Sequence, residues 1–159
     1  MNTHEIAARL RARVERATKI LGAVPESEAA RRPAPGKWSR KEILGHLVDS
    51  ASNNHQRFVR ARFQDDLVFA GYEQDDWVTA EGWQERPWRE ILELWRLYNL
   101  HLAHVIACTP AELAQRAQTR HNLHLRAWKP IAEGAPATLA WFMDDYVGHL
   151  EHHLAQAGG

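Results

Sequence analysis

Apolar residues recur at helical spacing in four separate segments of this chain, and no segment alternates between apolar and polar residues as a half-buried strand would. The first segment begins after Asn2, and Glu5 stands where it completes a capping box. Its apolar residues are Ile6, Leu10, Val14, Ala17 and Leu21. The pattern predicts an amphipathic helix that ends at Gly22.

Three further helices are predicted in the same way. The second begins at Ser39, because a glutamate three residues later forms another capping box, and it extends to about Phe63. The third begins at Pro87, a residue that suits the first turn of a helix, and it ends before Pro110. The fourth covers residues 138–157. All four carry an apolar face that must be buried against another element.

The segments between these helices are rich in proline, glycine and acidic residues. Residues 25–37 are predicted to be mostly connection, and residues 110–118 to contain a short helical piece. Residues 64–86 and 119–136 form two long connections. Four amphipathic helices with two long connections describe an all-α four-helix bundle, in which side chains on facing helices build metal and cofactor sites. We expect residues 1–159 to form a single domain, because no internal repeat or second unit is visible.

The composition excludes several classes of partner. The 20 Lys and Arg residues balance the 20 Asp and Glu residues, and no segment collects basic residues, so the chain lacks the electrostatic footprint of a nucleic-acid-binding protein. No apolar stretch approaches the ~18 residues that a membrane span requires. The single cysteine, Cys108, excludes an internal disulfide. We therefore expect a soluble, cytoplasmic protein without a nucleic-acid or membrane partner.

Two histidines near the C-terminus interrupt an apolar stripe. His149 and His153 are four residues apart, so they lie one turn apart on the same face of the fourth helix. The apolar stripe of Leu139, Phe142 and Tyr146 continues into this face. Buried imidazoles need polar partners, and a metal ion is one way to satisfy two of them. A metal site is the first hypothesis, provided that another element supplies a third ligand.

The second helix carries a stripe of polar residues beside its apolar face. The stripe consists of His46, Asp49, Ser50, Asn53 and Arg57. A solvated face would usually carry lysine and glutamate, whereas these residues form hydrogen bonds of defined geometry. Periodicity alone leaves two interpretations open: a functional surface, or a partly exposed flank of the helix.

Several short motifs occur in an order that resembles a known family. They are Gly36–Ser39 with the polar stripe that follows, Tyr72–Trp77, Tyr98–His101 and Tyr146–Gln156. Together they resemble the DinB-like (YfiT-type) metal-binding four-helix bundles, and the similarity covers most of the chain apart from about 110–136. The last motif matches the histidine-rich ending of that family.

The resemblance implies a metal held by three histidines: His46 from the second helix, and His149 and His153 from the fourth. Three neutral imidazoles leave a coordination position for water or substrate, and they suit zinc, nickel or iron. Related bundles are described as metal-dependent hydrolases and as transferases that use a low-molecular-weight thiol, bacillithiol or mycothiol. The sequence does not separate these two reactions.

Other residues are candidates for roles around the metal. Asp49 and Asn53 are predicted to orient a ligand imidazole or to face the substrate. Arg57 is a candidate for binding a substrate carboxylate or the acidic groups of a thiol cofactor. His101 has a counterpart in the family and is a further candidate for substrate contact, and the alternative for it is a hydrogen-bonded histidine of the core. For the polar residues of the second helix, the alternative is a hydrogen-bond network between helices.

Three functions are compatible with these observations. The first is a metal-dependent enzyme that activates water or a thiol for hydrolysis or S-transfer on a small molecule. The second is a non-catalytic bundle that binds metal or a ligand, in a stress response. The third is a structural bundle that dimerises, and the abundance of aromatic residues makes a homodimer plausible.

Overall fold

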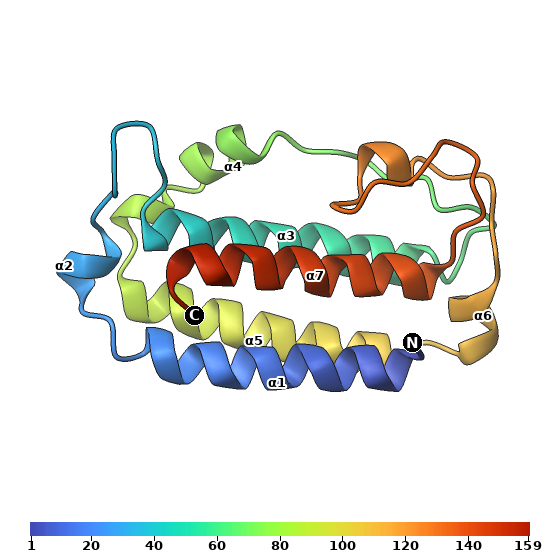
Figure 1. Cartoon of the computed structure of the whole chain (residues 1–159), viewed down its shortest axis with the longest axis horizontal. Helices are drawn as coiled ribbons and strands as arrows, with labels where there is room; N and C mark the ends of the chain where they lie inside the picture. Colours follow the sequence, from blue (N-terminus) through green and yellow to red (C-terminus); the bar gives the residue numbers. More distant parts are fainter.

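The computed structural model describes all of residues 1–159, and its long elements are four helices (Figure 1). They are α1 (Thr3–Leu21), α3 (Arg40–Arg60), α5 (Trp88–Ala107) and α7 (Leu139–Ala157). The structure contains no strand, although isolated bridges join Leu67 to His121 and Gln118 to Ala137. The predicted all-α four-helix bundle is therefore confirmed. None of the helices is both long enough and apolar enough to cross a membrane.

The four long helices form a ring in which α1 and α3 each contact both α5 and α7. In Figure 1, α3 and α5 run in the same direction, and α1 and α7 run in the opposite one. The chain must therefore return along the bundle between α3 and α5, and residues 61–87 make this crossover. The short helix α4 (Gln74–Ala80) and the 3₁₀ helix η1 (Trp83–Glu85) lie on it.

The helices begin at the capping residues that the sequence predicts. Asn2 and Ser39 each form a complete capping box with the glutamate three residues later, and the Thr138 side chain caps α7. The end of α3 differs from the prediction, because the helix stops at Arg60 rather than near Phe63. The Phe63 side chain is 84% exposed, so it contributes no core contact that would extend the helix.

The connections contain more local structure than the sequence indicates. Beyond α4 and η1, the chain forms α2 (Glu26–Ala29) and the 3₁₀ helix η2 (Leu123–Leu125), and the short helix predicted within residues 110–118 is present as α6 (Ala111–Gln115). The two bridges tie the second long connection, 108–138, to the crossover and to itself. Figure 1 shows both long connections on the side of the bundle where α3 and α7 lie. They therefore cover the pair of helices that carries the candidate histidines.

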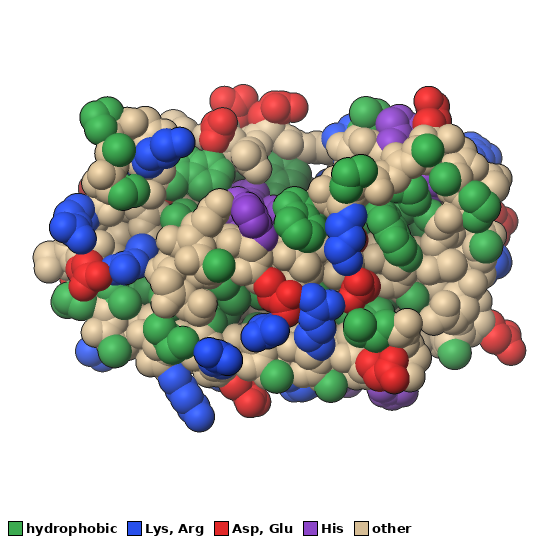
Figure 2. All heavy atoms as spheres, viewed as in Figure 1, with side chains coloured by type: hydrophobic (Ala, Val, Ile, Leu, Met, Phe, Trp, Pro, Cys, Tyr) green, Lys and Arg blue, Asp and Glu red, His purple; other side chains and the backbone are tan.

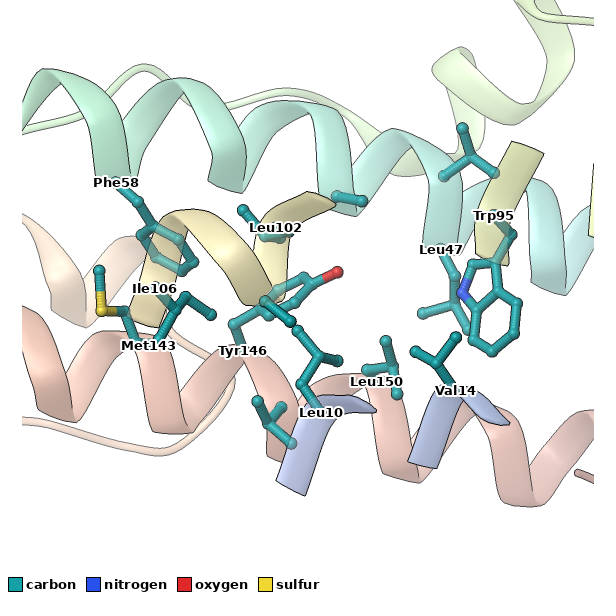
Figure 3. Packing of buried hydrophobic residues seen from close by; sticks show 14 of the residues in the cluster. Leu10, Val14, Leu47, Phe58, Trp95, Leu102, Ile106, Met143, Tyr146 and Leu150 are labelled. Atoms are coloured by element: carbon teal, nitrogen blue, oxygen red, sulfur yellow. The ribbon is translucent and has the colours of Figure 1, made fainter. Parts of the chain in front are cut away.

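Buried apolar side chains from all four long helices form one continuous core. Figure 3 shows Trp95 of α5 beside Leu47 of α3 and Val14 of α1, and Tyr146 of α7 near Leu10. The Tyr146 hydroxyl donates a hydrogen bond to Oδ1 of Asn99, at 2.5 Å. This bond satisfies two polar groups inside the core and joins α7 to α5, the two helices on opposite corners of the ring.

The crossover is anchored to α3 by Trp83, whose side chain is 3% exposed. Its ring lies so close to Gly45 that a Cβ at that position would be 2.1 Å from the Trp83 ring. The indole N–H donates to Oδ2 of Asp49, at 3.1 Å. Glycine at position 45 therefore permits the contact that fixes the end of the crossover on α3.

Gly45→Ala is expected to destabilise the protein by about 1–3 kcal/mol, because the methyl group would displace the Trp83 ring. Urea unfolding followed by circular dichroism measures this loss.

Gly82→Ala is the comparison variant, because Gly82 has a positive φ of 63° but open space around it. The cost of this substitution is therefore backbone strain alone. Trp83→Leu should relieve the clash of Gly45→Ala, and a strictly additive double variant would contradict the packing argument.

Candidate metal centre

Three histidines from two helices converge at one point of the bundle. His46 lies on α3 and is 1% exposed, and His149 and His153 lie one turn apart on α7 and are half-buried. The ring centroids are 5.3 Å apart for His46 and His149, and 4.8 Å apart for His46 and His153. Those of His149 and His153 are 4.6 Å apart. The structure thus brings together the three residues predicted to bind metal.

The three imidazoles present their nitrogen atoms to one another. One ring nitrogen from each residue lies within 4.8 Å of the other two, and Nε2 of His46 is 3.4 Å from Nε2 of His149. A tetrahedral ion about 2.0–2.1 Å from each nitrogen separates two ligand nitrogens by roughly 3.3 Å. The separation of the His46 and His149 nitrogens matches this value, and His153 supplies a third nitrogen within 4.8 Å.

The other ring nitrogens have different surroundings. Nδ1 of His149 lies 3.5 Å from the Ser50 hydroxyl, and Nδ1 of His153 lies 2.9 Å from Oε1 of Gln156. Nδ1 of His46 is buried and has no hydrogen-bond partner. Groups of this kind fix the orientation and tautomer of a ligand imidazole. Ser50 and Gln156 supply that contact for the two histidines of α7.

Burial keeps these histidines neutral. Loss of solvation, together with a smaller contribution from the neighbouring histidines, lowers the pKa of His46 to about 4 and that of His149 to about 3. Burial also lowers the pKa of His153. Metal binding requires the neutral imidazole. The cluster is therefore in its metal-binding protonation state at neutral pH.

A cavity of about 640 Å³ opens beside the cluster. Its wall includes His46, Ser50, Asn54 and Arg57 from α3, and Tyr146 and His149 from α7. Figure 2 shows histidine side chains at the surface near a hollow whose upper edge carries a group of acidic residues on α4. Small-molecule sites have volumes of about 300–1,000 Å³. The cavity therefore has the size of a small-molecule site, and two of the three histidines lie in its wall.

The two long connections complete the cavity. The crossover contributes Tyr72, and the second connection contributes Arg126 and Trp128. Asp145 of α7 holds the second connection in place, because its carboxylate accepts hydrogen bonds from the backbone N–H groups of Trp128 and Lys129, at 2.9 and 2.7 Å. Burial raises the pKa of Asp145. The cavity thus has two walls of helix and two walls of connection.

The sequence of the whole bundle matches one family. A family model described as the DinB superfamily matches residues 8–157. This chain belongs to the DinB superfamily. The family resemblance that the sequence motifs indicate is therefore confirmed, and the match includes the three histidines and both long connections of this DinB-superfamily protein.

A solved structure shares the fold of this DinB-superfamily protein. YfiT from Bacillus subtilis, described as a probable metal-dependent hydrolase with an unusual four-helix bundle topology, superposes with a TM-score of 0.72 and 16% sequence identity. The match covers 98% of this chain and 82% of YfiT. At this level of identity the likeness shows the fold. No curated protein sequence matches the chain significantly.

The polar stripe of α3 divides between two environments. Arg57 lines the cavity as predicted for a substrate-facing residue, whereas Asp49 and Asn53 lie outside it. Asp49 accepts the hydrogen bond from Trp83 and makes none to His46, and the Asn53 amide donates to the Asp49 carbonyl oxygen. Neither residue makes a hydrogen bond to a ligand histidine, and their role around the metal stays a prediction. Burial raises the pKa of Asp49 to about 6.

His101 stands apart from the other candidates. It is exposed on α5, and its ring packs edge-on against His55, with the centroids 5.1 Å apart. It does not line the cavity. The reason is the helix arrangement: the cavity lies over α3 and α7, and residues on the outer face of α5 cannot reach it.

Among the residues of the cavity wall that were not predicted as site residues, four are polar and bear on the chemistry of the site: Asn54, Tyr72, Arg126 and Asp145. Asn54 lies eight residues after His46, a spacing that places it on a similar side of the helix. Helical periodicity could therefore have identified Asn54 as a candidate. Tyr72 stands at the start of a motif that supports the family resemblance. Arg126 and Asp145 had no local signal, because their positions depend on how the second connection folds over α7.

The metal-free protein is expected to lose stability as the pH falls from about 6.5 towards 4. The folded-state pKa values of His46 and His149 lie below the unfolded value, so the unfolded chain binds more protons in this window and the free energy of unfolding decreases. Each histidine contributes a slope that approaches ~1.4 kcal/mol per pH unit. Urea unfolding in EDTA at several pH values measures the total slope.

His149→Gln should make this slope shallower, because the variant removes one of the histidines whose pKa is lowered in the folded protein. His4→Gln, a change at an exposed residue at the start of α1, is the matched control and should leave the slope unchanged. An identical pH dependence for the native chain and His149→Gln would contradict the assignment of the slope to the cluster.

Proposed function

We propose that this DinB-superfamily protein is a metal-dependent hydrolase of a small molecule, with zinc, nickel or iron held by His46, His149 and His153. The observation that carries the proposal is that the three imidazoles converge beside a cavity of substrate size, with His46 and His149 in its wall. A site with three protein ligands keeps a coordination position open, which distinguishes catalytic from structural metal sites. The description of YfiT, a protein of the same fold, agrees with this reaction class.

A bound ion would supply Lewis acidity and would lower the pKa of a coordinated water or thiol. The chain's own residues shape and hold the site. Ser50 lies beside His149 and positions its ring. Tyr72 offers a protonated hydroxyl to a substrate oxygen, because burial raises its pKa to about 12. Asp145 holds the second connection over the cavity and so limits the access of water.

A thiol-dependent transfer is the alternative reaction for the same centre. Cys108, the chain's only cysteine, is exposed at the end of α5 and does not line the cavity. The protein therefore has no nucleophilic thiol of its own at this site, and such a reaction requires a low-molecular-weight thiol such as bacillithiol or mycothiol. The experiment that tests the hydrolase includes this alternative.

The test begins with elemental mass spectrometry of the purified chain, before and after incubation with zinc, nickel or iron. We expect about one ion per chain. The loaded protein is then assayed against ester and amide panels, with and without added thiol. Turnover without thiol supports hydrolysis, and turnover only with thiol supports transfer. Bound metal without turnover in either panel favours the non-catalytic binding bundle. Absence of binding at micromolar metal would overturn the metal centre itself.

A further inference from the structure

Two arginines line the cavity without an acidic partner. Arg57 is 7% exposed, and its only hydrogen bonds run from Nη2 to the Ala70 carbonyl oxygen, at 2.9 Å, and from Nη1 to Oδ1 of Asn54, at 3.4 Å. The remaining N–H groups of its guanidinium have no acceptor, although buried arginines are normally paired. Burial lowers the pKa of Arg57, but an arginine stays charged in proteins. The α3 wall of the cavity thus contains an uncompensated positive charge.

Arg126, in the second long connection, provides the second positive charge. Its only hydrogen bond runs from Nη1 to the Leu125 carbonyl oxygen, at 3.3 Å, and its Nε is buried without a partner. The guanidinium lies directly against Gly71, where a Cβ would be 2.1 Å from Nη1. Because Arg57 binds the carbonyl of the adjacent residue, Ala70, the two guanidinium groups meet at the same short piece of backbone.

The carboxylates that line the cavity do not neutralise this pair. Both oxygens of Asp145 accept backbone hydrogen bonds from the second connection. Glu73, Asp75 and Asp76 are exposed at the start of α4, on the edge of the hollow. Two adjacent cations in a partly desolvated site repel each other, and an anion between them would accept hydrogen bonds from both. Arginine pairs of this kind suit carboxylate and phosphate oxygens.

The arginines lie far from the histidines along the cavity. Arg57 is eleven residues beyond His46 on α3, so their backbone positions are about three turns, or ~16 Å, apart along the helix axis, and the Arg57 guanidinium reaches back to Asn54, one turn nearer to His46. Ser50 and Asn54 line the cavity between them. A ligand that reaches both ends must be elongated. Binding energy from such a remote group can be used to orient the reacting group.

We propose that Arg57 and Arg126 form an anion-binding subsite, and that the substrate is an elongated small molecule with a carboxylate or phosphate group about two to three helical turns from the reacting bond. The position of the reacting bond rests on the proposed function at the histidines. The anion subsite itself depends only on the two arginines and needs no metal.

Isothermal titration calorimetry with inorganic phosphate and with succinate tests the subsite. Both probes are titrated into the zinc-loaded chain and into the chain kept in EDTA. We expect at least one of them to bind in both states, and the tighter probe identifies the substrate class as phosphate or carboxylate. Binding that requires zinc would place the anion on the metal and overturn the proposal, as would the failure of both probes to bind.

Three variants locate the binding. Arg126→Gln should weaken the affinity roughly tenfold or more, because charged hydrogen bonds are lost. Gly71→Ala should also weaken it without any change in net charge, since the new methyl group displaces the Arg126 guanidinium. Arg11→Gln, which removes the same charge from the exposed face of α1, is the control and should bind like the native chain. Equal affinities in all variants would overturn the proposal.

The outcome is independent of the proposed reaction. If the probes bind through Arg126 and no ester or amide is turned over, the anion subsite stands and the hydrolase falls. If hydrolysis is found and the probes bind all variants equally, the hydrolase stands and the subsite falls. Circular dichroism of each variant confirms that the bundle is folded before its affinity is interpreted.

Discussion

His149→Ala is expected to remove bound metal and, with it, the proposed hydrolytic turnover. The variant deletes one of three nitrogen ligands whose atoms lie within 4.8 Å of one another. Loss of a group that merely orients a ligand already lowers metal affinity about 10- to 100-fold, so loss of the ligand itself should exceed ~100-fold. Competition with a chromophoric chelator measures the affinity, and elemental mass spectrometry of the purified variant measures the occupancy.

His104→Ala is the matched control for this experiment. His104 is exposed on α5 and is not part of the cluster, so its removal should leave metal affinity and occupancy unchanged. His46→Ala should behave like His149→Ala, with a larger cost to stability, because His46 is buried in α3. Full metal occupancy in a folded His149→Ala variant would contradict the three-histidine metal centre.

The fold and the histidine cluster were accessible from sequence because both depend on helical periodicity. Capping boxes at Asn2 and Ser39 set the starts of α1 and α3. The spacing of His149 and His153 set their common face, since residues four apart on a helix always share one. The third ligand, His46, could not be derived from periodicity alone, because the register of α3 against α7 is a property of the packed bundle. The family resemblance supplied it.

The rest of the site depends on contacts between connections, which leave little local signal. Gly71 and Arg126 are far apart in sequence, and only the folded connections place the guanidinium on the glycine. Asp49 lies in a correctly predicted helix, yet its contacts also could not be predicted from the sequence. Its position, about 100° around the helix from Ser50, turns it from the cavity towards Trp83, and a residue of the crossover decides its role.

Among the residues of the hydrophobic core, Trp95 is expected to contribute most to stability. Trp95→Ala should lower the free energy of unfolding by about 3–5 kcal/mol, a large part of the ~5–15 kcal/mol that stabilises a typical domain. The side chain is fully buried and lies beside Val14 and Leu47 (Figure 3). Its loss would leave a cavity between α1, α3 and α5. Urea unfolding of the metal-free chain measures the change.

Trp95→Phe separates packing from hydrogen bonding at the same position. The indole Nε1 of Trp95 is buried and has no hydrogen-bond partner, so phenylalanine removes an unsatisfied donor and keeps most of the apolar contacts. Its cost should stay below about 1.5 kcal/mol. Because Leu47 adjoins His46 on α3, Trp95→Ala should also loosen the metal centre, whereas Trp95→Phe should not. Equal losses of stability and metal affinity in both variants would show that the indole N–H, rather than the packing of α5 on α3, supports the site.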